Sequence, residues 1–148
     1  MKILLSKQKK KILKQLNEQF GIEKLPYLLL RFGKEKIRLY SGSLAVEELN
    51  ILDKKIRIET IGLYLAKEQV DGIRLTLDGV QLLKNQITKN ILEINDKQAK
   101  EWLKGNDLLI ESDNAFKIIK NNNHFLGCGK STGERITNFI PRERRIKS

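Results

Sequence analysis

The sequence predicts an α+β protein, in which a small N-terminal α/β domain precedes a C-terminal β-barrel. Helical and strand-like apolar runs alternate through the first half, whereas short strand-like runs separated by turn residues fill most of the second half. The polar run 84–90 lies between them, and we expect one domain over 1–88 and the other over 89–148. This run has no Gly, Ser or Pro, so we expect the two domains to pack together.

The first half is expected to open with a helix and to continue mainly as strands. Residues 6–17 place Ile12 and Leu16 at helical spacing, with Ser6 as the N-cap and Gly21 as the residue that ends the helix. A further short helix is expected at 43–52, capped by Ser43, and a short helix or a turn at 78–83. The expected strands, of which the first two form a hairpin, are 25–32, 37–40, 56–66 and 73–77, with turns at 33–34 and 71–72.

The second half combines one helix with several short strands. A strand over 91–94 leads to Asn95 and Asp96, which are suited to cap a helix that runs through Lys104. Trp102 lies on the apolar face of this helix, and Gly105 follows where a C-terminal glycine is expected. The four strands expected after it are 107–111, 116–120, 124–129 and 135–140.

The charge of the chain indicates a polyanionic partner. There are 29 Lys and Arg against 18 Asp and Glu, which gives a formal net charge of +11. RNA, DNA and an acidic membrane surface would all be attracted, although a Lys-rich composition can also reflect genome bias or growth at high temperature. No apolar stretch approaches the roughly 20 residues of a membrane span, and no signal-peptide core is present. We therefore expect a cytoplasmic protein that does not use a membrane.

The residues predict no catalytic site, metal site or cofactor. Cys128 and His124 are the only cysteine and histidine, so neither an intramolecular disulfide nor a four-ligand zinc site is expected. Four residues apart in a strand, they would lie roughly 13 Å from each other, too far for a nucleophile and its base. Gly129, Lys130 and Ser131 resemble the end of a phosphate-binding loop, but the required first glycine is replaced by His124.

The second half resembles PUA domains. Residues 91–109 look like the opening of that domain, a strand and a helix followed by a glycine that bends the chain into the next strand. Residues 125–132 resemble a PUA strand in which small residues follow an apolar pair, and residues 138–146 resemble the closing strand. The first half, through residues 61–66 and 71–79, resembles the pre-PUA domain of archaeal and eukaryotic ribosome-biogenesis factors. A similar arrangement occurs in some Sun-type rRNA cytosine-5 methyltransferases.

The resemblance implies RNA binding along the glycine-containing loop after the helix and along the closing strand. Arginine side chains there would offer planar donors that match phosphate and stack on bases. In a closing strand, Arg142 and Arg144 would share one face, and Arg145 and Lys147 the other. The expected RNA-binding residues are Lys104, Gly105, Asn106, Lys130, Ser131, Arg135, Arg142, Arg144, Arg145 and Lys147.

We therefore predict a non-catalytic RNA-binding protein that acts in rRNA or tRNA maturation or ribosome biogenesis. Its partners would be a structured RNA and a ribosome-assembly or RNA-modification protein. The alternatives are a protein-interaction adaptor and a detached accessory subunit of an RNA methyltransferase, and charge alone does not exclude DNA as the ligand.

Two further features of the sequence bear on the surface that would bind RNA. A basic run on the first helix, Lys7 to Lys14, is either a solvated face, an extension of the RNA footprint or a membrane-surface helix. The aromatic residues lie in apolar runs and are expected in the core, so no stacking platform for bases is predicted. The residues in question are Tyr27, Phe32, Tyr40, Tyr64 and Trp102.

Overall fold

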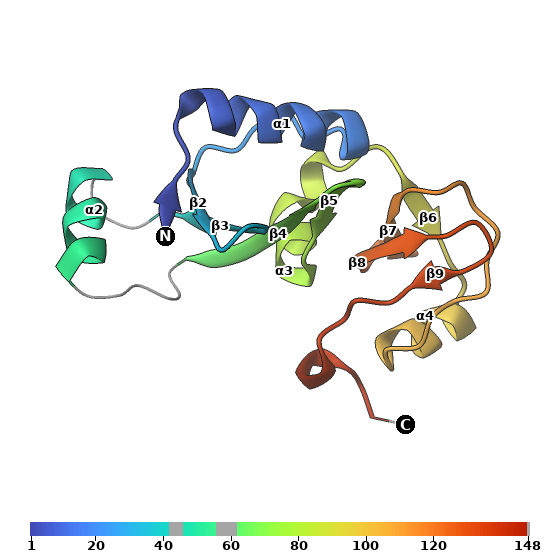
Figure 1. Ribbon diagram of the computed structural model, residues 1–148. Coiled ribbons are helices and arrows are strands. Elements are labelled where there is room, and N and C mark those ends of the chain that lie inside the picture. Colours follow the sequence, from blue (N-terminus) through green and yellow to red (C-terminus); the bar gives the residue numbers. More distant parts are fainter. Residues whose placement is uncertain (42–45, 56–61, 148) are drawn as a thin grey trace.

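The computed structural model describes residues 1–41, 46–55 and 62–147, and it shows the predicted α+β fold with two sheets side by side (Figure 1). The first sheet is antiparallel throughout, in the order β1-β2-β3-β4-β5. Its strands are β1 Lys2–Ile3, β2 Leu28–Phe32, β3 Lys36–Tyr40, β4 Leu63–Gln69 and β5 Gly72–Leu75. The predicted hairpin is confirmed, because β2 pairs with β3 along its whole length.

Helix α1 (Ser6–Phe20) lies along one face of this sheet (Figure 1). The prediction that Ser6 caps this helix is wrong, because Ser6 is already helical and the N-cap is Leu5. The Gln8 side chain accepts the free Leu5 N–H at 3.2 Å. Gly21 ends the helix as expected, with a left-handed φ of 81° and an N–H that donates to the Asn17 carbonyl.

Two shorter helices complete the first half. Helix α2 is Val46–Lys55, while the expected Ser43 cap and the first part of the predicted strand 56–66 lie outside the described residues. Helix α3 is Leu77–Leu83, and the Thr76 hydroxyl caps it by accepting the Gly79 N–H at 3.0 Å.

The second sheet has the order β6-β7-β8-β9 and curls into a half-barrel. Strand β6 runs parallel to β7 and the remaining pairs are antiparallel. The strands are β6 Ile91–Glu93, β7 Phe116–Asn121, β8 His124–Ser131 and β9 Ile136–Thr137. Helix α4 (Asp96–Leu103) has the predicted cap, since Asn95 accepts the Gln98 N–H at 2.8 Å and Gln98 accepts the Asn95 N–H at 3.0 Å.

Two predicted strands of this half are wrong in extent. The expected strand 107–111 is reduced to a single bridge between Leu108 and Ile136, and the expected strand 135–140 ends at Thr137. Asn138 accounts for the early end: its side-chain amide donates to the carbonyls of Trp102 and Asn106 at 2.7 and 2.9 Å. These bonds tie the chain to the end of α4, so it leaves the ladder there.

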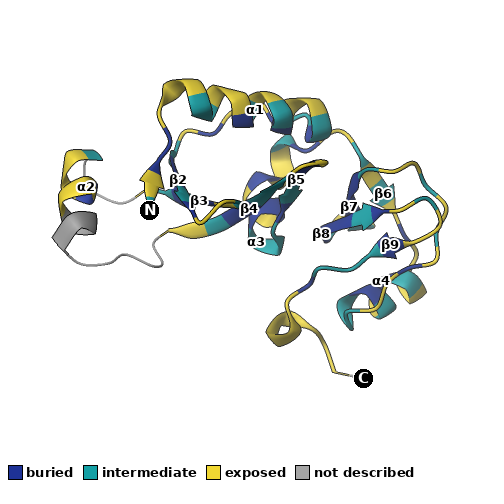
Figure 2. Cartoon of the chain, viewed as in Figure 1, coloured by how far each residue is buried: buried dark blue, intermediate teal, exposed yellow. Residues whose placement is uncertain are grey.

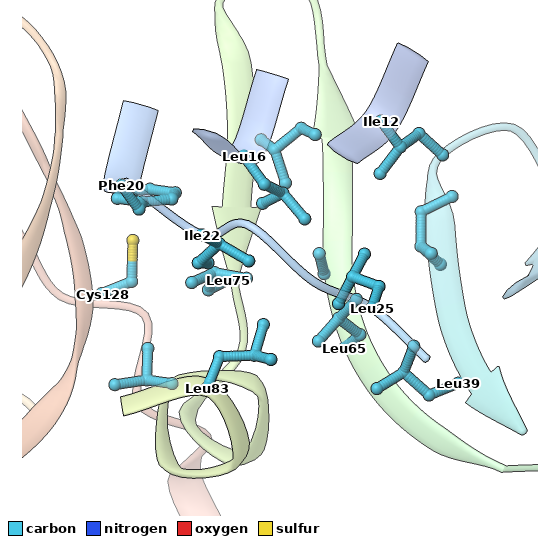
Figure 3. Packing of buried hydrophobic residues seen from close by; sticks show 14 of the residues in the cluster. Ile12, Leu16, Phe20, Ile22, Leu25, Leu39, Leu65, Leu75, Leu83 and Cys128 are labelled. Atoms are coloured by element: carbon cyan, nitrogen blue, oxygen red, sulfur yellow. The ribbon is translucent and has the colours of Figure 1, made fainter. Parts of the chain in front are cut away.

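The two halves share one hydrophobic core, as expected from the polar run between them. Phe20, Leu75 and Leu83 from the first half lie in one cluster with Cys128 from β8, and Figure 3 shows these side chains together. Phe116 and Ile118 of β7 belong to the same cluster. The position of the domain boundary stays a prediction, since residues from both sides of it belong to one hydrophobic cluster.

A second cluster fills the half-barrel, and the aromatic residues divide between core and surface. Trp102 is fully buried at the centre of this cluster, and its indole N–H donates to the Leu126 carbonyl at 2.8 Å. Phe32 is buried as expected, whereas the expectation was wrong in degree for Tyr27, Tyr40 and Tyr64, which are only half-buried. The outward side of α1 and the C-terminal segment are exposed (Figure 2).

Candidate nucleic-acid interface

The loop after α4 is shaped by Gly105. Its φ of +94° lies in the region that side chains rarely adopt, and its N–H donates to the Trp102 carbonyl at 2.9 Å. The helix thus ends abruptly, and the predicted residues Lys104 and Asn106 flank the glycine at its terminus. Because Gly105 has no side chain, the backbone at the middle of this loop is open to contact by another group.

The C-terminal segment lies directly on this loop. The Ile146 N–H donates to the Leu103 carbonyl at 2.9 Å, and the Arg145 Nε donates to the Ile140 carbonyl at 3.0 Å. A Cβ added at Gly105 would lie 2.3 Å from the Arg145 Nε, so the guanidinium occupies the space that the glycine leaves open. The structure therefore brings together two of the predicted site residues, Gly105 and Arg145, that are far apart in the sequence.

The two residues that flank Gly105 are bound to one carboxylate. Glu101 accepts from the Asn106 side-chain amide at 2.7 Å and lies 3.4 Å from the Lys104 ammonium. The Asn106 hydrogen bond, followed by the charge of Lys104, holds the pKa of Glu101 below its usual range. Glu101 therefore stays ionised at neutral pH and orients both side chains beside the loop.

The predicted closing strand is replaced by a turn, so the arginine faces predicted for it are wrong. Residues Arg142–Arg144 form a single turn of 3-10 helix, in which side chains do not alternate as they do in a strand. Arg144 points back to the first half and pairs with Asp78 at 3.1 Å. Arg142 and Lys147 are exposed and have no ion-pair partner among the described residues. We name Gly105, Asn106, Arg142, Arg145 and Lys147 the loop–tail surface.

Three further predicted residues make contacts of their own. Lys130 pairs with Asp71 of the first half at 2.9 Å and lies over the Phe116 ring, so it connects the two halves. Ser131 is fully buried and its hydroxyl donates to the Ser112 carbonyl at 3.0 Å, which removes it from any contact with a ligand. Arg135 is exposed near Asp107, with 3.7 Å between the charged atoms.

Sequence reasoning missed Asn138 as a residue that builds this surface. Besides its bonds to the two carbonyls of the α4 end, its side-chain oxygen accepts the Ile140 N–H at 2.8 Å. Asn138 thereby fixes the direction in which the tail leaves β9. No local pattern distinguishes such an asparagine from one in a turn, because the two carbonyls that its amide group binds are more than 30 residues away.

The lysines of α1 form a separate exposed row. Lys7, Lys10, Lys11 and Lys14 are all exposed. Lys9, in contrast, is half-buried and its ammonium donates to the Tyr27 carbonyl at 2.5 Å. In Figure 1 this helix lies at the opposite side of the molecule from the C-terminal tail, so the row is not continuous with the loop–tail surface.

Within the described residues, no group of three or more His, Cys, Asp and Glu is placed to hold a metal ion. No helix in the described part of the chain is both long and apolar enough to cross a membrane. His124 is exposed at the start of β8, while Cys128 is buried in the shared core.

Burial raises the pKa of the Cys128 thiol to about 12. The thiolate fraction at pH 8 is therefore about a thousandfold lower than for a thiol of pKa 9.0. We expect a disulfide reagent such as dithionitrobenzoate to leave the folded protein unmodified for many minutes and to react at once in guanidinium chloride. Modification of the folded protein at the rate of a small free thiol would show that Cys128 is accessible and that the shared core opens.

Comparison with known families identifies the class of the second half. Residues 89–146 match the family model described as the methyltransferase RsmF PUA domain. The predicted resemblance to PUA domains and to the Sun-type methyltransferases is therefore confirmed. The matched residues include α4, the second sheet and the tail up to Ile146, and so contain every residue of the loop–tail surface except Lys147.

Individual relatives make the likeness more specific. The ribosomal RNA small subunit methyltransferase F of Shewanella oneidensis is 31% identical over 140 residues, which is 93% of this chain. The enzyme of the same name from Aeromonas salmonicida is 32% identical over 91 residues, 60% of the chain. The chain spans only 28% and 19% of the lengths of these two relatives.

A solved structure supports the fold of the whole chain. A hypothetical protein of the archaeon Pyrococcus horikoshii superposes with a TM-score of 0.58 over 94% of this chain and 92% of its own. The two sequences are 13% identical, so this likeness concerns the fold alone. The relative placement of two sheets that share a core is thus an arrangement found in another protein.

Proposed function

We propose that this chain binds structured RNA through the loop–tail surface and acts in the modification of ribosomal RNA. One observation carries the proposal: Arg145 is seated on Gly105 within the part that matches a methyltransferase PUA domain, and the exposed cations Arg142 and Lys147 flank it along the tail. Cations that have no acidic partner are available to phosphates, and the planar guanidinium can also stack on a base. The net charge of +11 adds a general attraction to RNA.

The role that we propose is to hold RNA and not to transfer a methyl group. The relatives are named as rRNA methyltransferases, and the chain spans less than a third of the two that are described above. The family match concerns a PUA domain. We infer that the chain supplies RNA contacts to a catalytic domain, in the same polypeptide or as an accessory subunit, and that it does so in the cytoplasm.

A competition experiment tests the choice of ligand. The full chain should bind a structured fragment of small-subunit rRNA at least tenfold more tightly than a DNA duplex of equal length at the same salt concentration. A tRNA is the second RNA to compare, since the sequence left rRNA and tRNA open. Equal affinity for the RNA and the DNA would contradict the proposal.

The rival function is a protein-interaction adaptor, and one groove on the first half favours it. Leu63 and Leu82 are 36% and 41% exposed and line a hollow together with Tyr27 and Tyr40. Exposed apolar side chains that gather at one place are typical of protein contacts. The adaptor function predicts weak binding that does not distinguish RNA from DNA, so the same competition experiment separates the two functions.

Replacing Gly105 by alanine should damage the loop–tail surface in a specific way. The new Cβ would collide with the Arg145 guanidinium, and the positive φ would strain the backbone by about 1–3 kcal/mol. We expect a lower melting temperature and an RNA affinity that falls several-fold.

Gly33→Ala is the matched control for this variant. Gly33 also has a positive φ, +64°, but a Cβ there meets no atom within 4 Å. This variant should lose comparable stability and keep its RNA affinity. An unchanged affinity in Gly105→Ala would show that the position of Arg145 is irrelevant to binding.

A further inference from the structure

A groove of about 270 Å³ lies between the first sheet and the C-terminal segment. Tyr64 and Arg74 of the sheet line one wall, and Phe139 and Arg144 line the other. Gly127 of β8 also lines the groove. The groove adjoins the tail but shares no residue with the loop–tail surface, so its side chains have no role in the function proposed above.

Arg74 and Phe139, which both line this groove, are in direct contact. The Arg74 guanidinium carbon lies 4.1 Å from the centre of the Phe139 ring, a close cation–π contact. The neighbours of Arg74 in β5, Ile73 and Leu75, are buried on the side of α1, so Arg74 points to the opposite face of the sheet. No carboxylate pairs with Arg74 among the described residues.

Aromatic rings and cations continue to alternate beyond the groove. Tyr64 lies below the Arg38 guanidinium at 5.6 Å and the Lys36 ammonium at 5.5 Å. The same Arg38 is 5.9 Å from the Phe32 ring. Surfaces that bind unpaired nucleotides combine these two kinds of group, because bases stack on rings and guanidinium planes while cations meet the phosphates.

The rim of the groove also carries groups that suit a base edge. Asp78 and Arg144 are paired there at 3.1 Å, and both side chains are nearly half exposed, at 48% and 45%. An aspartate accepts from exocyclic amino groups and an arginine donates to ring nitrogens and carbonyls of bases. The volume lies close to the lower end of the range for small-molecule sites, roughly 300–1,000 Å³, which fits one nucleotide and not a helix.

From these observations we propose that the groove takes up one unpaired nucleotide of the RNA that the loop–tail surface holds. The base would stack on the Phe139–Arg74 pair, with Tyr64 beside it, and the strand would continue over Arg38 and Lys36. The inference rests on the proposed function and deepens it, because it specifies an RNA with an unpaired nucleotide next to a structured segment. It also assigns a role beside the stacked base to Tyr64, which the sequence analysis placed in the core.

Two RNA hairpins that differ in one feature test this inference. One is fully paired and the other carries a single bulged 2-aminopurine, whose fluorescence reports stacking. Wild-type protein should bind the bulged hairpin more tightly and quench its fluorescence. Stacking of one base predicts a preference of about 5- to 150-fold.

Phe139→Leu and Arg74→Gln should each remove most of this preference and leave the affinity for the paired hairpin unchanged. Phe139→Leu keeps the apolar bulk and removes the flat ring, so the fold is retained. Phe125→Ala is the matched control, because Phe125 is also half-buried beneath a cation, Lys120, at 5.5 Å, and is not among the residues that line the groove. This control should keep the preference for the bulge.

The possible outcomes separate the inference from the function on which it rests. If wild type binds both hairpins equally and tightly, RNA binding stands and the groove proposal is overturned. If the bulge is preferred but Phe139→Leu and Arg74→Gln both keep the preference, the nucleotide binds elsewhere and the groove proposal is again overturned. If neither hairpin binds, the proposed function itself fails.

Discussion

Replacing Arg142, Arg145 and Lys147 together by alanine should weaken binding to structured rRNA by about 10- to 100-fold at physiological salt. Each cation that meets a phosphate releases condensed counterions, so each loss lowers the slope of log affinity against log salt by about 0.7–0.9. The triple variant should therefore show a slope smaller by about two to three. The measurement is the affinity for a labelled rRNA fragment at a series of salt concentrations, with fluorescence anisotropy as the readout.

The matched control removes three exposed charges from α1. Lys7→Ala, Lys11→Ala and Lys14→Ala change the net charge by the same amount but lie away from the tail. If the loop–tail surface is the binding face, this control should lose less than about threefold in affinity, because only the general attraction is reduced. Equal losses in both triple variants would mean that binding follows net charge and not a defined surface.

Phe20→Ala should destabilise both halves of the protein together. Phe20 is fully buried at the end of α1, in the cluster that also contains Cys128 and Phe116 of the second half. Truncating a buried phenylalanine costs about 3–5 kcal/mol of unfolding free energy, a large part of the 5–15 kcal/mol that is typical of a whole domain. The melting temperature should fall by about 10 °C or more.

The single tryptophan makes the test of coupling direct. Trp102 lies in the second cluster, which does not include Phe20, so its fluorescence reports unfolding of the second half alone. Phe20→Ala should shift the fluorescence transition and the circular-dichroism transition by the same amount. Leu109→Ala, at a side chain that is 79% exposed, should shift neither by more than about 0.5 kcal/mol. A fluorescence transition that stays in place would show that the halves fold independently.

The sequence was sufficient to predict those elements whose ends are set by residues close together in the chain. The cap of α4 could be predicted because Asn95 and Gln98 are three residues apart and satisfy each other's backbone N–H groups. Gly105 and Gly21 could be predicted as helix ends for the same reason, since Gly21 directly follows Phe20 and Gly105 comes two positions after Leu103, the last apolar residue of α4. The hairpin of β2 and β3 followed from two apolar runs with a glycine turn between them.

The sequence could not predict the conformation of segments that are held by contacts with residues far away in the chain. The tail has the alternation of a strand, but Asn138 binds carbonyls at the end of α4, and the chain then forms a turn at Arg142–Arg144. Ser131 looked accessible beside a lysine, yet its hydroxyl is held by the Ser112 carbonyl inside the core. Neither contact leaves a trace in the sequence around the residue concerned.

The candidate site shows the same division. The residues of the loop and the tail could be named from the resemblance, but the seating of Arg145 on Gly105 is a contact across 40 positions of the chain. The groove was not predicted at all, because Arg74 and Phe139 come from different halves and each lies in a run that is typical of the core. Only the packing of the segment after β9 against the first sheet brings them together.

The most direct test of the loop–tail surface as the RNA-binding face is the response of individual amide signals in ¹⁵N–¹H NMR spectra when an rRNA hairpin is added to the full chain. The account predicts that the signals of Gly105, Asn106 and Arg145 shift and saturate with the bound RNA, while those of α1 from Lys7 to Lys14 stay in place. Saturating shifts that are confined to α1, with the Gly105 and Arg145 signals unmoved, would contradict it.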